Sequence, residues 1–230
     1  MKFYGLQKLT LLDYPGKTAC TIFTGGCNFR CPFCHNALLV TDIDGAKTYS
    51  DEEILEFLSK RKGLLDGVCI TGGEPLMHGD IAEFIKKVKD MGYKVKVDTN
   101  GTFPDRLCEL LENNLIDYVA MDIKNSKEKY AETAGTESIS ISEIEKSIKI
   151  LKSSDIDYEF RTTVVREFHT EEDIRKIAEW IKGAKRYFLQ NFEDSGNLIG
   201  ENMNAVPREI LEKMKNFAKP FVKNTQIRGV

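Results

Sequence analysis

Apolar residues recur along this chain in two alternating patterns. Short runs rich in β-branched residues predict buried strands, and the longer segments between them carry apolar residues at helical spacing. Alternation of this kind is typical of β-α units built around a parallel sheet. The six predicted strands span residues 19–23, 67–71, 94–98, 118–123, 159–165 and 187–190. The pattern therefore predicts an α/β fold.

Polar residues mark the beginnings of two predicted helices. Ser50 with Glu53, and Thr170 with Asp173, have the spacing of a capping box. In such a box the first side chain accepts a hydrogen bond from the backbone, and the second side chain returns one. Near the end of the chain, residues 221–227 predict one more extended segment.

Composition and charge limit the kinds of protein that the chain can be. Its 230 residues are 41% apolar and 30% charged, which is ordinary for a globular protein. Without a repeat or a flexible linker, residues 1–230 are expected to form a single domain. A net charge of -3 without a basic stripe argues against a nucleic acid partner. Without a signal peptide or a long apolar run, we expect no membrane segment and a cytoplasmic location.

The cysteines divide into a cluster and three single residues. Cys27, Cys31 and Cys34 lie within eight positions, in a loop that follows the first predicted strand. The single residues, each inside an apolar stretch, are Cys20, Cys69 and Cys108. This distribution favours a metal site together with buried thiols in a reducing compartment over a set of disulfides.

Three cysteines at this spacing leave one coordination position without a protein ligand. A structural zinc site needs a fourth ligand, and His35 is strained out of that role because it is adjacent to Cys34. A ferredoxin-like electron carrier uses four cysteines for each cluster, and no fourth cysteine stands at a usable spacing. Zinc thus stays the less favoured alternative to a cluster with one open iron.

Two motifs in order give the chain a resemblance to a known family. The CxxxCxxC spacing, with Phe33 before the last cysteine, resembles the signature of the radical S-adenosylmethionine (SAM) superfamily. Residues 71–75, Thr-Gly-Gly-Glu-Pro, resemble its GGE motif, which holds the amino group of SAM; alone, they would equally suit a strand-to-helix turn. The resemblance implies a partial (β/α)6 barrel, a [4Fe-4S] cluster and bound SAM. Its catalytic and SAM-binding positions here are Cys27, Cys31, Cys34, Gly72, Gly73 and Glu74.

Two further segments resemble the activating enzymes of glycyl radical enzymes. They are Asp-Thr-Asn-Gly at 98–101 and Met-Asp-Ile-Lys at 121–124. The resemblance implies that Lys124 contacts SAM, and that a monovalent cation binds to Asp98, Thr99, Met121 and Asp122. The alternative is that the two strand-end aspartates cap the helices that follow them.

Other positions carry the resemblance more weakly. The remaining positions that it assigns to SAM or its surroundings are Phe33, Asn36, Asp98, Arg161 and Gln190. Arg161 lies inside a predicted strand and would equally suit a structural ion pair. His78 and His169 are expected to be exposed or to stand at helix starts, and not to be catalytic.

The function implied by the resemblance is the activation of a partner enzyme. Residues 5–17 resemble the beginning of the activating proteins of anaerobic ribonucleoside-triphosphate reductase. The implied mechanism is reductive cleavage of SAM, followed by removal of a hydrogen from a glycine Cα of the partner. Flavodoxin or ferredoxin is the implied electron donor. Because residues 35–71 contain only Cys69, we expect one cluster.

Two other functions remain as alternatives. One is a small-molecule radical SAM enzyme, such as 7-carboxy-7-deazaguanine synthase, against which the paired segments at 98–101 and 121–124 argue. The other is a metal-binding or electron-transfer module, against which the GGE motif argues. An Arg-Gly pair at 228–229 is faintly similar to glycyl radical loops, but a terminal strand is the favoured interpretation.

Overall fold

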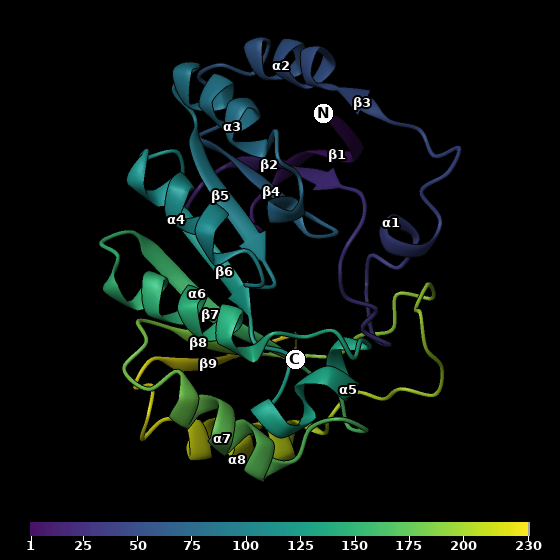
Figure 1. Ribbon diagram of the computed structural model, residues 1–230, viewed down its shortest axis with the longest axis vertical. Coiled ribbons are helices and arrows are strands. Elements are labelled where there is room, and N and C mark those ends of the chain that lie inside the picture. Colours follow the sequence, from purple (N-terminus) through teal and green to yellow (C-terminus); the bar gives the residue numbers. More distant parts are fainter. Residues whose placement is uncertain (230) are drawn as a thin grey trace. The chain divides into compact units, whose positions relative to one another are not determined.

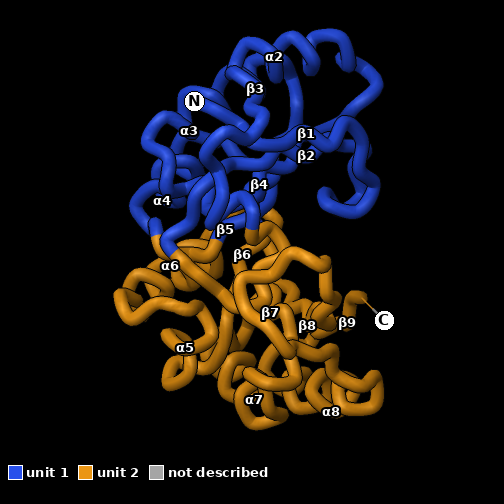
Figure 2. The backbone as a smooth tube through the Cα atoms, turned by 90° about the vertical axis from the view of Figure 1, so that its right-hand side faces the viewer, with its two compact units in different colours: residues 1–28, 38–99, 103–119 blue, residues 29–37, 100–102, 120–230 orange. Residues whose placement is uncertain are grey.

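The strands of the computed structural model are hydrogen-bonded in the order β3-β1-β2-β4-β5-β6-β7-β8-β9 (Figure 1). The structure describes residues 1–229, so Val230, the last residue after the Arg-Gly pair, lies outside the described residues. The chain divides into two compact units (Figure 2). The first unit comprises residues 1–28, 38–99 and 103–119, and the second comprises the remainder of the described chain.

The first unit is a mixed sheet with helices between its strands. Its strands are β1 (Lys2–Thr10), β2 (Ala19–Thr24), β3 (Tyr49–Ser50), β4 (Gly67–Gly72) and β5 (Lys94–Thr99), followed by the start of β6 (Tyr118–Asp122). Its helices are α1 (Leu38–Thr41), α2 (Asp51–Ser59), the 3-10 helix η1 (Pro75–Met77), α3 (Ile81–Asp90) and α4 (Pro104–Glu112). Strands β2, β4 and β5 are parallel and mostly buried, as expected for strands covered on both faces.

The second unit continues the β-α alternation. It holds the end of β6 and the parallel strands β7 (Asp157–Val164), β8 (Tyr187–Asn191) and β9 (Thr225–Arg228). Its helices are η2 (Lys127–Lys129), α5 (Tyr130–Ala134), α6 (Ile141–Ser153), α7 (Glu171–Trp180) and α8 (Arg208–Ala218). Helices α7 and α8 lie side by side (Figure 1).

The predicted α/β pattern is confirmed. The six predicted strands are β2, β4, β5, β6, β7 and β8, each within two residues of its predicted bounds. Strand β1 was not predicted; it runs antiparallel to β2 and β3, and its largely half-exposed residues lack a clear apolar run. Both capping boxes are present, at the starts of α2 and α7.

The single cysteines follow their prediction in two cases of three. Cys20 and Cys69 are fully buried, and burial raises the pKa of the Cys20 thiol to about 12. Cys108 is only partly buried, because it lies on the outer side of α4, where its thiol donates to the Glu112 carboxylate at 3.3 Å. None of the helices formed by residues 1–229 has the length and apolar character needed to cross a bilayer.

Replacing Thr170 with alanine should lower the free energy of unfolding by about 1 kcal/mol. The Thr170 hydroxyl accepts a hydrogen bond from the backbone N–H of Asp173 at 3.2 Å and donates one to the Asp173 carboxylate at 2.6 Å. Urea denaturation of the full-length protein measures the change. Thr170→Ser keeps the hydroxyl and serves as the control. An alanine variant as stable as the wild type would show that the cap does not hold α7.

Candidate functional site

The three clustered cysteines lie on irregular chain after β2. Cys27 belongs to the first unit, and Cys31 and Cys34 belong to the second, where the Cys34 backbone N–H donates to the Cys31 carbonyl at 3.0 Å. All three thiols are free of disulfides. Within residues 1–229, no three His, Cys, Asp or Glu side chains could hold one metal ion. A four-iron cluster takes one thiolate for each iron, and three thiols suit such a cluster with one iron left open.

The ammonium of Lys124, whose side chain is 16% exposed, influences the two cysteine thiols of the second unit. Burial raises the pKa of the Cys34 thiol, while the Asn36 backbone and the charge of Lys124 oppose that rise. Burial alone would lower the pKa of Lys124, but the charges of Asp122 and Cys31 raise it. Lys124 therefore stays protonated and favours the thiolate form that binds iron.

The backbone around Cys31 is fixed by contacts within the second unit. The Arg30 N–H donates to the Ala134 carbonyl at 2.9 Å, and the Gly200 N–H donates to the Pro32 carbonyl at 2.8 Å. Gly135 ends α5 with φ of 65°, and a Cβ there would lie 2.1 Å from the Arg30 carbonyl oxygen. Only glycine fits this approach, so the loop is held against the end of α5.

Aromatic rings hold the other side of the same loop. Phe33, which is 4% exposed, packs against Phe168 and His169 with ring centroids 5.7 and 6.3 Å apart. The exposed His35 lies 5.9 Å from the Phe192 ring. Phe33 therefore anchors the cysteine loop to the turn that precedes α7.

The glycines of the GGE segment lie directly against the strand end before the cysteines. The Gly73 N–H donates to the Thr24 carbonyl at 2.9 Å, and the Glu74 N–H donates to the Gly26 carbonyl at 2.8 Å. A Cβ on Gly73 would stand 1.8 Å from the Gly26 carbonyl oxygen, and Gly72 has φ of 112°. Glycine at both positions is therefore required by the packing of the backbone itself.

Glu74 is a buried carboxylate at the start of η1. It is 1% exposed, and its Oε1 accepts hydrogen bonds from the Leu76 backbone N–H at 3.0 Å and the Thr99 hydroxyl at 2.8 Å. Thr99 lies at the end of β5, so Glu74 links the ends of two parallel strands of the first unit. The orientation of the Glu74 carboxylate is thereby fixed in advance of any ligand.

Asp98 lies beside a lysine that the sequence interpretation did not use. The ammonium of Lys96 contacts Asp98 Oδ1 and lies 3.6 Å from the Cys69 sulfur. All three residues belong to β4 and β5 of the first unit and are buried. The predicted cation ligand Asp98 thus has a cationic partner from its own chain.

In the second unit, the structure brings together three of the predicted residues. Asp122 Oδ1 accepts a hydrogen bond from Arg161, and Oδ2 accepts one from Lys124 at 2.8 Å. Burial alone would raise the pKa of Asp122, but Arg161 and Lys124 hold it well below its usual range. Arg161, which lies within β7, is therefore a member of an ion pair, as the alternative interpretation expected.

The structure also describes three further residues that the sequence predicted for the site. Met121 is fully buried, and a Cβ on Gly101 would lie 2.0 Å from its terminal methyl group. Gln190 is half-buried in β8, where it pairs with Thr163. Asn36 is half-buried and approaches the Cys34 thiol through its backbone.

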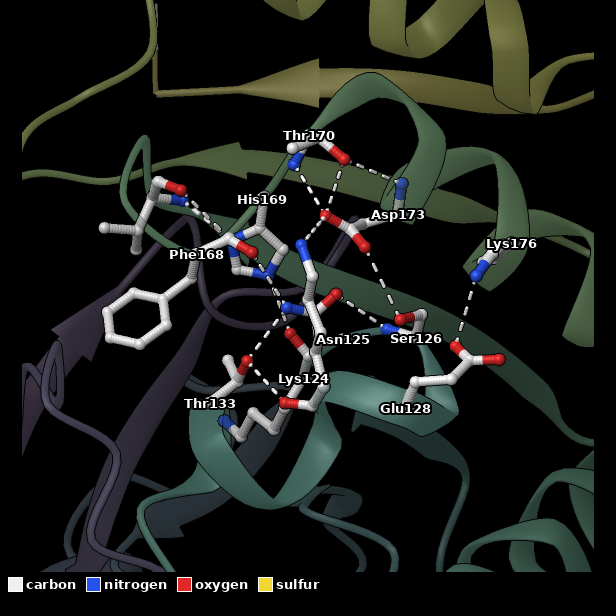
Figure 3. Close-up of polar contacts among 12 residues, drawn as sticks. Lys124, Asn125, Ser126, Glu128, Thr133, Phe168, His169, Thr170, Asp173 and Lys176 are labelled. Atoms are coloured by element: carbon white, nitrogen blue, oxygen red, sulfur yellow. Dashed lines mark hydrogen bonds and ion pairs between the residues drawn. The ribbon is translucent and has the colours of Figure 1, made fainter.

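His169 belongs to the site, and of the two expectations for it, an exposed position or a helix start, the second holds, because it stands directly before the N-cap of α7. It is 4% exposed, and its ring bridges two backbone segments of the second unit (Figure 3). Nδ1 accepts from the Val165 N–H at 3.1 Å, and Nε2 donates to the Lys124 carbonyl at 2.7 Å. The residue just before a helix N-cap often packs inward, and His169 holds that position before Thr170, a signal already present in the sequence.

Asn125 completes the support of the Lys124 backbone. Its side-chain amide donates to the Phe168 carbonyl at 3.0 Å and to the Thr133 hydroxyl at 2.8 Å, and Asn125 is fully buried (Figure 3). The segment that carries Lys124 is thus fixed from α5 on one side and from the turn before α7 on the other. A change at His169 or Asn125 would reach Lys124 through its backbone.

Comparison with known proteins groups this chain with one superfamily. The model of the Radical SAM superfamily matches residues 21–181. A protein of Methanocaldococcus jannaschii, provisionally named a glycyl-radical enzyme activating enzyme, is 35% identical over 98% of this chain and 95% of its own length. The 7-carboxy-7-deazaguanine synthase of Thermoplasma acidophilum is 30% identical over 74% of this chain and 82% of its own.

A solved structure shares the fold. The crystal structure of Streptococcus suis SuiB bound to S-adenosylmethionine superimposes with a TM-score of 0.69 at 15% identity. The match covers 90% of this chain and 49% of SuiB, so the present chain spans about half the length of that protein. At this identity the likeness concerns the fold alone, and it confirms the predicted partial barrel type.

In the His169→Gln variant, the free energy of unfolding should fall less than in the wild type as the pH is lowered. Burial lowers the pKa of His169 in the folded protein, against the opposing effect of its backbone hydrogen bonds, so the unfolded chain takes up a proton first as pH falls. The stabilising contribution of neutral His169 is therefore complete above about pH 6.5 and is lost progressively below it. Urea denaturation between pH 8 and 5 measures this; His35→Gln is the matched control. Identical pH profiles for His169→Gln and the wild type would contradict the assignment.

Proposed function

Because this chain belongs to the radical SAM superfamily and, within it, to the activating enzymes of glycyl radical enzymes, we propose that its substrate is an anaerobic ribonucleoside-triphosphate reductase. The observation that carries the activating function is the similarity to the M. jannaschii protein along nearly the whole of both chains. Residues 5–17 support the reductase as the partner, since they resemble the start of its activating proteins.

The family implies a [4Fe-4S] cluster and SAM, which together supply the one-electron cleavage that starts radical chemistry. We propose that Cys27, Cys31 and Cys34 bind three of the irons. The mostly buried ammonium of Lys124 stabilises the thiolates of Cys31 and Cys34. Phe33 keeps this loop in place and excludes water from it.

The remaining polar groups suit the amino-acid end of SAM. In the proposal, Glu74 and the backbone of Gly72 and Gly73 accept hydrogen bonds from the SAM amino group, while Lys124 and Arg161 face its carboxylate. Asp122 fixes the positions of both cations, because it binds one with each of its oxygens. Asn36 and Gln190 are assigned to the nucleoside part of SAM.

The monovalent cation implied by the resemblance does not fit the charges of its predicted ligands. Asp98 already has the ammonium of Lys96, and Asp122 has Arg161 and Lys124. The Thr99 hydroxyl donates to Glu74. We therefore assign no step to a bound cation.

Several wider features belong to the same proposal. Flavodoxin or ferredoxin is proposed as the electron donor, and the cytoplasm, which keeps thiols reduced, as the location. Residues 1–230 are proposed to act as a single radical SAM domain, since the superfamily match extends over parts of both compact units.

A second candidate function is the synthesis of 7-carboxy-7-deazaguanine. The T. acidophilum relative favours it, although that relative covers less of this chain at lower identity than the M. jannaschii protein does. Incubation with the pterin substrate of such a synthase, SAM and a reductant distinguishes the two functions: a deazapurine product would replace the activating function by this second one.

Cys31→Ala should abolish the release of 5′-deoxyadenosine from anaerobically reconstituted protein given SAM and a strong reductant. The loss of one thiolate removes a ligand of the proposed cluster, so the iron content should fall as well. Cys108→Ala is the matched control because that thiol lies on the surface of α4, and it should retain full iron and turnover. Equal turnover of Cys31→Ala and the wild type would contradict the assignment, as would a fully loaded wild-type protein that forms no product.

The partner assignment predicts a difference between two glycyl radical enzymes. With SAM and reductant, the protein should produce a glycyl radical signal in electron paramagnetic resonance spectra of an anaerobic ribonucleoside-triphosphate reductase, and none on a pyruvate formate-lyase. The wild type without SAM is the control. A signal on the formate-lyase alone would keep the activating function and replace the proposed partner.

A further inference from the structure

Lys96 and Asp98 form a buried ion pair in the middle of the first unit. Both lie on the same face of β5, because alternate residues of a strand point to the same side. Their side chains are only 3% and 11% exposed, respectively. A buried lysine at this depth requires an anionic partner, and Asp98 is in direct contact with it.

The surroundings of the Lys96 ammonium come from three neighbouring strands. Cys69 pairs with Lys96 in the parallel register of β4 and β5, which places its sulfur 3.6 Å from the ammonium nitrogen. The Cys69 thiol also lies 3.9 Å from Asp98 Oδ1. The ring of Tyr118, at the start of β6, faces the ammonium with its centroid at 6.0 Å. This cage offers a carboxylate, a polarisable sulfur and an aromatic face to one small cation.

We propose that the ammonium of Lys96 is the resident counter-charge of Asp98, in the place that a soluble monovalent cation would otherwise take. A protonated lysine carries the single positive charge of a potassium ion in a group of similar size. A second cation beside Asp98 would be repelled by the ammonium of Lys96. It would also have to share the single Asp98 carboxylate with that ammonium. The consequence for SAM rests on the proposed function: SAM binding by this protein does not depend on potassium or sodium.

The test compares cations at constant ionic strength. Full-length, cluster-loaded protein without SAM is melted in potassium chloride, sodium chloride or tetramethylammonium chloride, whose cation is too large for the site. The wild type should have the same Tm in all three salts. The proposal would be overturned if the Tm of the wild type were higher in potassium or sodium chloride than in tetramethylammonium chloride and if this increase saturated with the cation concentration.

Two variants test the proposal by removing one or both charges of the Lys96–Asp98 pair. Lys96→Met removes the charge and keeps the length of the side chain, and it should lower Tm in tetramethylammonium by about 6–20 °C. Potassium or sodium should restore part of that loss. The double variant Lys96→Met with Asp98→Asn removes both charges, so it should melt above Lys96→Met and show no response to the cation. A Lys96→Met variant that responds no more than the wild type would also overturn the proposal.

SAM affinity provides a readout that separates this proposal from the proposed function. Equilibrium dialysis of SAM with the wild type should give one Kd in all three salts, whereas Lys96→Met should bind more tightly in potassium than in tetramethylammonium. Melting in the absence of SAM does not depend on radical chemistry. If the protein failed to cleave SAM, the proposed function would be wrong and the melting result would still stand. If the Tm of the wild type depended on potassium or sodium, the counter-charge proposal would be wrong and the proposed function would still stand.

Discussion

Charges that are withdrawn from water along the strands must be neutralised within the chain, and this requirement shapes both compact units. In the first unit, Lys96 and Asp98 neutralise one another beside β4. In the second unit, Asp122 binds Arg161 and Lys124. Leaving one member of such a pair without its partner costs several kcal/mol, so the positions of these side chains are fixed before a ligand arrives. The result is a preorganised set of donors and acceptors.

Glycines supply the second constraint, because they allow backbone segments to approach where a side chain would collide. Gly73 lies against Gly26 in the first unit, and Gly135 lies against Arg30 in the second. Each contact fixes one end of the chain that carries the clustered cysteines. The absence of a side chain at Gly73 thus lets the GGE segment hold the chain that leads into the clustered cysteines.

Much of the fold could be predicted from the sequence, because the six buried strands are short segments rich in β-branched and other apolar residues and the capping boxes are local. Strand β1 escaped prediction, since its pairing with β2 and β3 depends on distant residues and not on its own pattern. The clustered cysteines and the GGE segment were singled out from their spacing and their resemblance to a family, and their roles with a cluster and SAM stay predictions. The bridge made by His169 could not be found that way, because its partner is the Lys124 carbonyl, 45 residues earlier in the chain.

The role of Lys96 was missed for a related reason. Its alternation with Val95 and Val97 fits an ordinary strand, and the sequence does not show that the side chain turns inward to Asp98. Only the register of β4 with β5 adds Cys69 to the pair. Motifs report which residues a family uses, whereas the charge balance of a site depends on residues between the motifs. The motifs support an activating enzyme, and the charge balance supports the proposal that its Asp98 needs no soluble cation.

The most direct measurement of the central claim follows the abstracted atom. An anaerobic ribonucleoside-triphosphate reductase that contains deuterated glycine is incubated with this protein, SAM and a reductant, and the 5′-deoxyadenosine is analysed by mass spectrometry. The account predicts that deuterium appears in the 5′-deoxyadenosine as the glycyl radical forms. Unlabelled 5′-deoxyadenosine, formed in the same amount with and without the reductase, would contradict it.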